Sequence, residues 1–179
     1  MPNLKLILLI LTVSVYALSA SITLPENFQA KFTQKITNPK KKVINYSGKV
    51  SFSDKVLLKW EYVKPTKKEV CTNGYDLRVV DHDLEQVSNY RINKGFDLSK
   101  VLKKAKPYKD RKYVYIAKYE GKNYTIQTDA KGRLSRVAYF DDLENTVLII
   151  FTKMKYGKGK LKASSLKCNY PKSYDIING

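Results

Sequence analysis

The chain has 179 residues, of which 43% are hydrophobic and 28% charged, a mixture typical of one folded domain and not of a disordered chain. Lys and Arg number 34 against 16 Asp and Glu, which gives a formal net charge of +18. Two cysteines exclude a disulfide-rich scaffold and a four-thiolate zinc site, and a single histidine excludes most histidine-based metal sites. The 14 tyrosines favour strands, so the sequence predicts a basic, β-rich domain.

Residues 1–20 have the layout of a cleaved secretory signal peptide. One positive charge precedes the apolar run Leu6–Tyr16, and small residues then allow cleavage after Ser19 or Ala20. A short membrane anchor is the less favoured alternative, because the run is about half as long as a membrane span requires. We expect residues 21–179 to form a single domain outside the cytosol, and no cysteine near the cleavage point offers a site for lipid attachment.

Two short helices are predicted. A capping box begins at Thr23, and Phe28, Phe32 and Ile36 then recur at four-residue spacing, which indicates an amphipathic helix of about three turns. The segment Asp97–Lys104 places apolar residues at i, i+3 and i+4, which indicates a second amphipathic helix.

Period-two alternation dominates the remainder of the chain. No alternation of strands and helices occurs, so a parallel sheet is not expected, and a long antiparallel sheet escapes exposed edges by curling towards a barrel. We therefore predict a mainly β fold, an unclosed antiparallel barrel of ten to eleven strands with the two helices as a lid over its apolar side. The expected strands are Val43–Phe52, Val56–Val63, Lys68–Cys71, Tyr75–Val80, Leu84–Ile92, Lys112–Tyr119, Asn123–Thr128, Arg133–Phe140, Thr146–Tyr156 and Leu166–Tyr170.

The two cysteines, Cys71 and Cys168, are 97 positions apart. In an oxidising compartment they can form a disulfide, and the alternative is a pair of free thiols that face the interior. The sequence leaves both arrangements open.

Catalytic signals are poor. His82 lies between Asp81 and Asp83 and can be drawn as a general base, but turn-forming residues of this kind more often make a hairpin turn. The sequence contains no nucleophile elbow, phosphate-binding loop, dinucleotide fingerprint or zinc-ligand spacing. We therefore expect no enzymatic activity, no cofactor and no metal.

The excess of positive charge favours an anionic partner. Nucleic acid is one candidate, but a signal peptide directs the protein to a compartment where nucleic acid is uncommon. Anionic phospholipid headgroups and acidic envelope polymers fit better. An extracytoplasmic interaction protein with a basic face is accordingly the alternative to the function described next.

An ordered set of segments between residues 28 and 87 resembles the LolA-type periplasmic carriers of outer-membrane lipoproteins. The resemblance implies an unclosed barrel with a helical lid over a hydrophobic cavity, in a protein that takes acylated lipoproteins from an inner-membrane ABC transporter to an outer-membrane acceptor. That acceptor is LolB-type or unknown, and we expect a monomeric carrier that binds no nucleic acid. The segments are Phe28–Lys35, Gly48, Leu58–Tyr62 with Pro65, Thr72–Leu77 and Asp81–Val87.

Residues of the expected cavity and lid follow from the resemblance and from strand parity. Members of the family place an Arg, followed by Pro, between the strand opened by glycine and the strand that carries tryptophan. This chain has Asp54 and Lys55 there, so these two residues are the candidates for control of the lid. The residues expected to line the acyl-chain cavity or lid are Phe28, Phe32, Trp60, Tyr62, Leu77, Val79, Leu98, Leu102, Val114 and Ile116.

Overall fold

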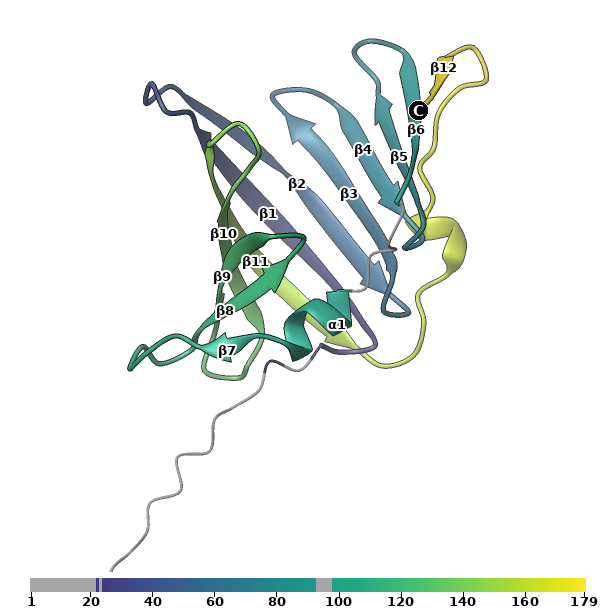
Figure 1. The fold of residues 1–179 in the computed structure, drawn as a ribbon. Helices are drawn as coiled ribbons and strands as arrows, with labels where there is room; N and C mark the ends of the chain where they lie inside the picture. Colours follow the sequence, from purple (N-terminus) through teal and green to yellow (C-terminus); the bar gives the residue numbers. More distant parts are fainter. Residues whose placement is uncertain (1–21, 23, 93–97) are drawn as a thin grey trace, which may run out of the picture.

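A computed structural model describes residue 22 and residues 24–92 and 98–179. In this structure the chain forms one strongly curved sheet (Figure 1). The sheet has 12 strands in the order β12-β6-β5-β4-β3-β2-β1-β11-β10-β9-β8-β7. All strand pairs are antiparallel except β12 with β6. The elements are β1 (Asn27–Thr37), β2 (Val43–Ser53), β3 (Leu57–Lys64), β4 (Lys68–Thr72), β5 (Asp76–Asp81), β6 (Gln86–Arg91), α1 (Leu98–Lys103), β7 (Lys106–Pro107), β8 (Val114–Tyr119), β9 (Lys122–Thr128), β10 (Leu134–Phe140), β11 (Thr146–Gly157), the 3-10 turn η1 (Ala163–Leu166) and β12 (Asp175–Asn178).

The prediction of an unclosed, mainly β fold is confirmed, and so is the helix within Asp97–Lys104, whose first residue lies outside the described part. The helix predicted from Thr23 to Ile36 is wrong. This segment contains β1, which pairs with β2 on one side and with β11 on the other. Its apolar side chains alternate with exposed ones, which is the period of a strand and not of a helix.

The C-terminal part also differs from the prediction. Residues Leu166–Tyr170 form no strand, although burial alternates along them as it does in an extended chain. The short strands β7 and β12 were not predicted. The signal peptide predicted for residues 1–20 lies outside the described residues.

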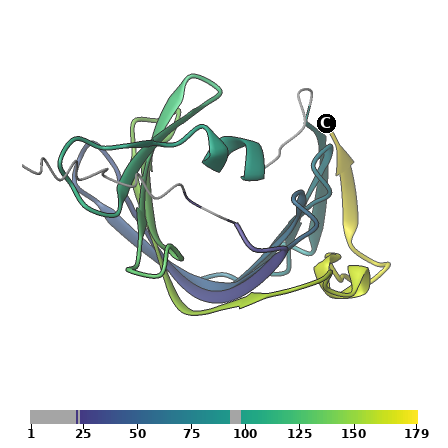
Figure 2. The ribbon, with the colours of Figure 1, turned by 90° about the horizontal axis from the view of Figure 1, so that it is seen from below.

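The two faces of the sheet carry separate apolar clusters. Phe28, Phe32, Val50 and Phe52 belong to the larger cluster, which fills the concave face together with α1. Figure 2 shows α1 inside the curve of the sheet and the C-terminal segment outside it. The smaller cluster, built on the two cysteines with Val80 and Val87, lies beneath that C-terminal segment.

Candidate functional site: the concave face of the sheet

The floor of the concave face consists of aromatic side chains from β1, β2 and β3. Phe32 is 1% exposed, and its ring centroid lies 4.7 Å from that of Trp60 and 5.1 Å from that of Tyr62. In the strand register, Gly48 on β2 stands between Phe32 on β1 and Tyr62 on β3. Because Gly48 has no side chain, rings from two strands that are not neighbours meet above it.

Tyr62 is the polar member of this floor. Its hydroxyl donates a hydrogen bond to Gln34 Oε1 at 3.1 Å. Burial, with smaller contributions from Tyr139 and Tyr46, raises the pKa of Tyr62 from 10.0 to about 12. The neutral phenol is therefore the form that the folded protein favours.

A loss of stability at alkaline pH follows from this pKa. Between about pH 10 and about pH 12 the folded state keeps Tyr62 neutral, while the unfolded chain ionises it. The contribution of this pKa shift to the free energy of unfolding is therefore complete below about pH 10 and is lost as the pH rises towards about 12. We expect Tyr62→Phe to lose less stability than the wild type between about pH 8 and about pH 11 in urea unfolding. Tyr75→Phe, at a residue 65% exposed, should follow the wild type, and equal pH profiles for all three proteins would contradict the prediction.

A cavity of about 300 Å³ opens on the concave face between the arm formed by β3, β4 and β5 and the turn that joins β8 to β9. Its volume is near the lower end of the range for small-molecule sites, about 300–1,000 Å³. Trp60 and Leu77 contribute to its wall from one side and Tyr119 from the other. The complete lining is Leu58, Trp60, Val70, Thr72, Leu77, Ile92, Tyr119 and Glu120.

Helix α1 lies on the same side of the sheet. Its Leu102 is 4% exposed and belongs to the concave cluster, and Leu98 packs against that cluster. The helix contacts β8.

Eight of the ten residues predicted for the cavity or lid lie on the concave side. Phe28 and Phe32 do so from the central strand β1, so they belong to the floor and not to a lid helix. Leu77 lines the cavity, and Val79 lies on the same face of β5, because it pairs with Val70 of the cavity wall.

Val114 and Ile116 lie on the opposite face of β8. Tyr115 and Ala117, which alternate with them, are the members of the concave cluster. The sequence did not identify Val70 or Tyr119, whose proximity to Trp60 depends on the strand pairing.

The lid-control candidates lie in the turn between β2 and β3. Asp54 and Lys55 both have positive φ values, 54° and 66°. Asp54 Oδ2 forms an ion pair with Lys160 Nζ at 2.8 Å, so its charge is partnered by the C-terminal segment. Control of the lid by these two residues stays a prediction.

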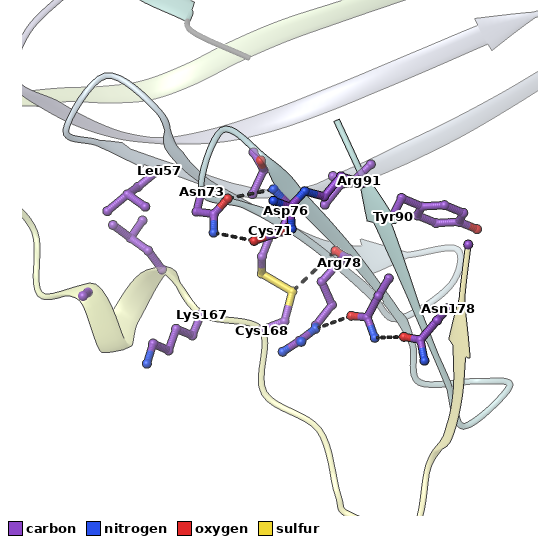
Figure 3. A pocket seen from close by; sticks show the side chains of 16 residues that line it. Leu57, Cys71, Asn73, Asp76, Arg78, Tyr90, Arg91, Lys167, Cys168 and Asn178 are labelled. Atoms are coloured by element: carbon purple, nitrogen blue, oxygen red, sulfur yellow. Dashed lines mark hydrogen bonds and ion pairs between the residues drawn. A yellow bond between two sulfur atoms is a disulfide. The ribbon is translucent and has the colours of Figure 1, made fainter. Parts of the chain in front are cut away.

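A larger pocket, about 610 Å³, lies on the convex side beneath the C-terminal segment (Figure 3). Its wall includes the disulfide between Cys71 and Cys168, whose Cα atoms are 5.8 Å apart. Arg78 and Arg91 also line this pocket, and Arg78 Nε donates to Asn89 Oδ1 at 2.8 Å. It shares only Thr72 and Leu77 with the cavity on the concave face, so the larger of the two pockets is not the one that the apolar floor forms.

A buried charge network holds the C-terminal segment beside the disulfide. Lys59 is 5% exposed and forms an ion pair with Glu69 at 3.0 Å. Lys59 Nζ also donates to the carbonyl oxygen of Lys167 at 3.0 Å, and the Asn169 amide donates to Glu69 Oε2 at 2.9 Å. His82 Nδ1 lies 3.2 Å from the Tyr174 hydroxyl, so the histidine is a neighbour of this network.

Comparison with known proteins places this architecture in a family. The sequence profile of the family described as "Outer membrane lipoprotein carrier protein LolA" matches residues 25–164. The chain belongs to this family. The LolA family is a carrier family and not an enzyme family, so the resemblance and the expectation of a non-enzymatic carrier are both confirmed.

Relatives support the assignment to the LolA family over most of the chain. An outer-membrane lipoprotein carrier protein of Campylobacter jejuni is 33% identical over 150 residues, which are 84% of this chain and 85% of the relative. The protein of the same description from Wolinella succinogenes is 29% identical over 125 residues, 70% of this chain and 72% of the relative. A conserved protein of Thermus thermophilus shares the fold, with a TM-score of 0.55 at 13% identity over 87% of this chain and 92% of that one.

Proposed function

We propose that the concave face holds the acyl chains of lipoproteins while the protein carries them through the periplasm. On this proposal, an inner-membrane ABC transporter supplies the lipoprotein and an outer-membrane acceptor receives it. The observation that supports the proposal is the apolar floor and cavity on one side of an unclosed sheet, in a member of a lipoprotein carrier family.

The energetics of acyl chains fit this role. Each CH₂ group transferred from water into an apolar site contributes about 0.8 kcal/mol, so a multi-acyl anchor does not leave a membrane without a protein that shields it. An apolar wall binds chains without directional contacts and accepts many different lipoproteins. The half-buried members of the floor, such as Trp60 and Tyr62, leave apolar surface available for such chains.

The disulfide bond agrees with a periplasmic location. The disulfide between Cys71 and Cys168 is of a kind that forms in oxidising compartments such as the periplasm. Of the helices in the described part of the chain, none is long and apolar enough to cross a membrane.

The test is release of lipoproteins from spheroplasts whose inner membrane carries the exporter. Purified wild-type protein should yield a soluble one-to-one complex with an acylated lipoprotein. Leu77→Glu places a carboxylate in the cavity wall, and because a buried charge opposes apolar ligands, we expect at least about a tenfold loss of complex.

A matched control is available on the other face. Ile116→Glu makes the same chemical change at another half-buried aliphatic residue, but outside the concave cluster, so release should stay within about twofold of the wild type. Equal release by both variants would remove the cavity from the mechanism. No release by the wild type, with a known carrier active in the same assay, would overturn the carrier role itself.

A further inference from the structure

Exposed cationic side chains gather on the convex face of four neighbouring strands near the middle of the sheet. Strands β2, β1, β11 and β10 are neighbours in the sheet and contain no Asp or Glu along their whole length. In β1 and β2, alternation directs the buried apolar residues to the concave side and Lys31, Lys35 and Lys49 outwards. On β10 and β11 the same outward side also holds apolar residues, namely Ala138, Phe140, Leu148 and Ile150. We define the cationic face as the exposed residues Lys31, Lys35, Lys49, Arg136, Lys153 and Lys155.

These six charges lack carboxylate partners. Within the described residues, none of them comes within 4.0 Å of an acidic oxygen. Lys31 and Lys49 are direct partners across the β1–β2 ladder, and like charges in that relation destabilise a sheet. An arrangement that costs stability in the isolated protein and that no internal anion neutralises indicates an external anionic partner.

The composition of the face distinguishes between classes of partner. Stereospecific protein interfaces are enriched in aromatic residues and Arg and depleted in Lys. The cationic face has five lysines and one arginine, and most of its other outward residues on β1 and β2 are small or amide side chains such as Thr33, Ser47 and Gln29. One aromatic residue, Phe140, lies on the same side at the end of β10. Such a face suits a laterally mobile layer of negative headgroups, which needs charge density and no fixed register.

We propose that the cationic face docks the protein on anionic phospholipid surfaces. The C-terminal segment covers one end of this side, where residues 158–161 bond to Asn27 and Ser53, and then continues outside the arm formed by β4, β5 and β6 (Figure 2). The six residues of the cationic face stay exposed. The acyl cavity is on the other side of the sheet and stays accessible when the cationic face touches a bilayer. The site is therefore a second surface, distinct from the concave face and independent of its cargo.

The experiment measures partition onto vesicles of phosphatidylcholine with one-third phosphatidylglycerol. Each lysine near an anionic surface contributes about 1 kcal/mol, which is about fivefold in partition. The variant Lys31→Gln/Lys49→Gln/Lys155→Gln should therefore bind on the order of a hundredfold more weakly than the wild type. Binding of the wild type should disappear on pure phosphatidylcholine and when salt rises from about 0.05 M to about 0.5 M.

A control with the same change of charge separates a located face from net charge. Lys103→Gln/Lys104→Gln/Lys106→Gln removes three exposed lysines at the end of α1 and in the edge strand β7, which is separated from β10 by β9 and β8, and should keep partition within about threefold. Lys49→Glu should weaken partition while the melting temperature stays equal or rises, because it places opposite charges across the ladder.

Two results would overturn the proposal. One is an equal loss of partition for the two triple variants, and the other is tighter binding of the wild type to an acidic polymer such as heparin than to the vesicles. Lipoprotein release by the cationic-face variants should be unchanged, so this test does not depend on the carrier role.

Discussion

Replacement of Gly48 by alanine should cost about 3 kcal/mol or more of the free energy of unfolding and lower the melting temperature by roughly 10 °C. A Cβ atom at this position would overlap the backbone carbonyl oxygen of Glu61 and come within 2.9 Å of Phe32 Cε1. The first contact is with backbone on β3, so it cannot be relieved by rotation of a side chain. The register shifts between Ser47 and Gly48, and this irregularity brings β3 close to β2 at the glycine.

The control is a glycine in open space. Gly121 has a φ of 80° and no atom within 4 Å of a Cβ placed on it, and asparagine adopts that backbone region more readily than other residues. Gly121→Asn should therefore change stability by less than about 1 kcal/mol. Urea unfolding of both variants and the wild type measures the effect. A Gly48→Ala protein as stable as the wild type would show that β2 and β3 separate at this point without penalty.

Gly48 also matters for the candidate site, because its missing side chain allows Phe32 to touch Tyr62. The sequence resemblance includes this glycine, but the reason for it became visible only in the register of three strands. Local periodicity identified β2 and β3 correctly as strands. It could not show which residues on them are opposite one another, since pairing is a non-local property.

The error in β1 has a simple physical cause. Phe28, Phe32 and Ile36 are four residues apart, and a spacing of four fits both a helix face and every second position of a strand. A helix stripe would also need apolar residues at i+3, and Lys31 and Lys35 occupy those places. Ala30 and Gln34, at the even positions, are buried as the strand requires, so the distinguishing signal was present.

The misplacement of Val114 and Ile116 is an error of one residue. The alternation of β8 was predicted, but strand parity assigned Val114 and Ile116 to the concave side, whereas Tyr115 and Ala117 are the buried residues. An alternating strand whose two faces are both partly apolar does not reveal which face is inside. The phase is settled by Ile126 of β9, which is opposite Tyr115 and belongs to the concave cluster.

The C-terminal segment was the least predictable part of the chain. Leu166 and Cys168 alternate with exposed residues as in a strand, but they pack onto the outside of the sheet without joining its hydrogen-bonded ladder. The partners of Cys168, Cys71 and Val80, are distant in sequence. Sequence pattern identifies an extended segment here, and only the tertiary structure shows what it covers.

Loss of the disulfide in this segment should have the largest effect on stability. Cys71 and Cys168 close a loop with a sequence separation of 97, and in the chain-entropy model a cross-link of that length contributes about 4 kcal/mol. The variant Cys71→Ala/Cys168→Ala should therefore melt roughly 8–16 °C below the oxidised wild type. Alanine is the suitable replacement, because both cysteines are buried and serine would introduce unpaired hydroxyl groups.

Reduction supplies the matched control. A thiol reductant should lower the melting temperature of the wild type towards that of the double-alanine variant and leave the variant unchanged. Lipoprotein release at temperatures well below both melting points should differ by less than about twofold, because the disulfide and the acyl cavity are on opposite sides of the sheet. If the variant were as stable as the wild type, the Lys59–Glu69 network and the β12–β6 pairing would be sufficient to hold the segment. Loss of release without loss of stability would instead give the convex-side segment a direct part in transport, which the separation of the two faces argues against.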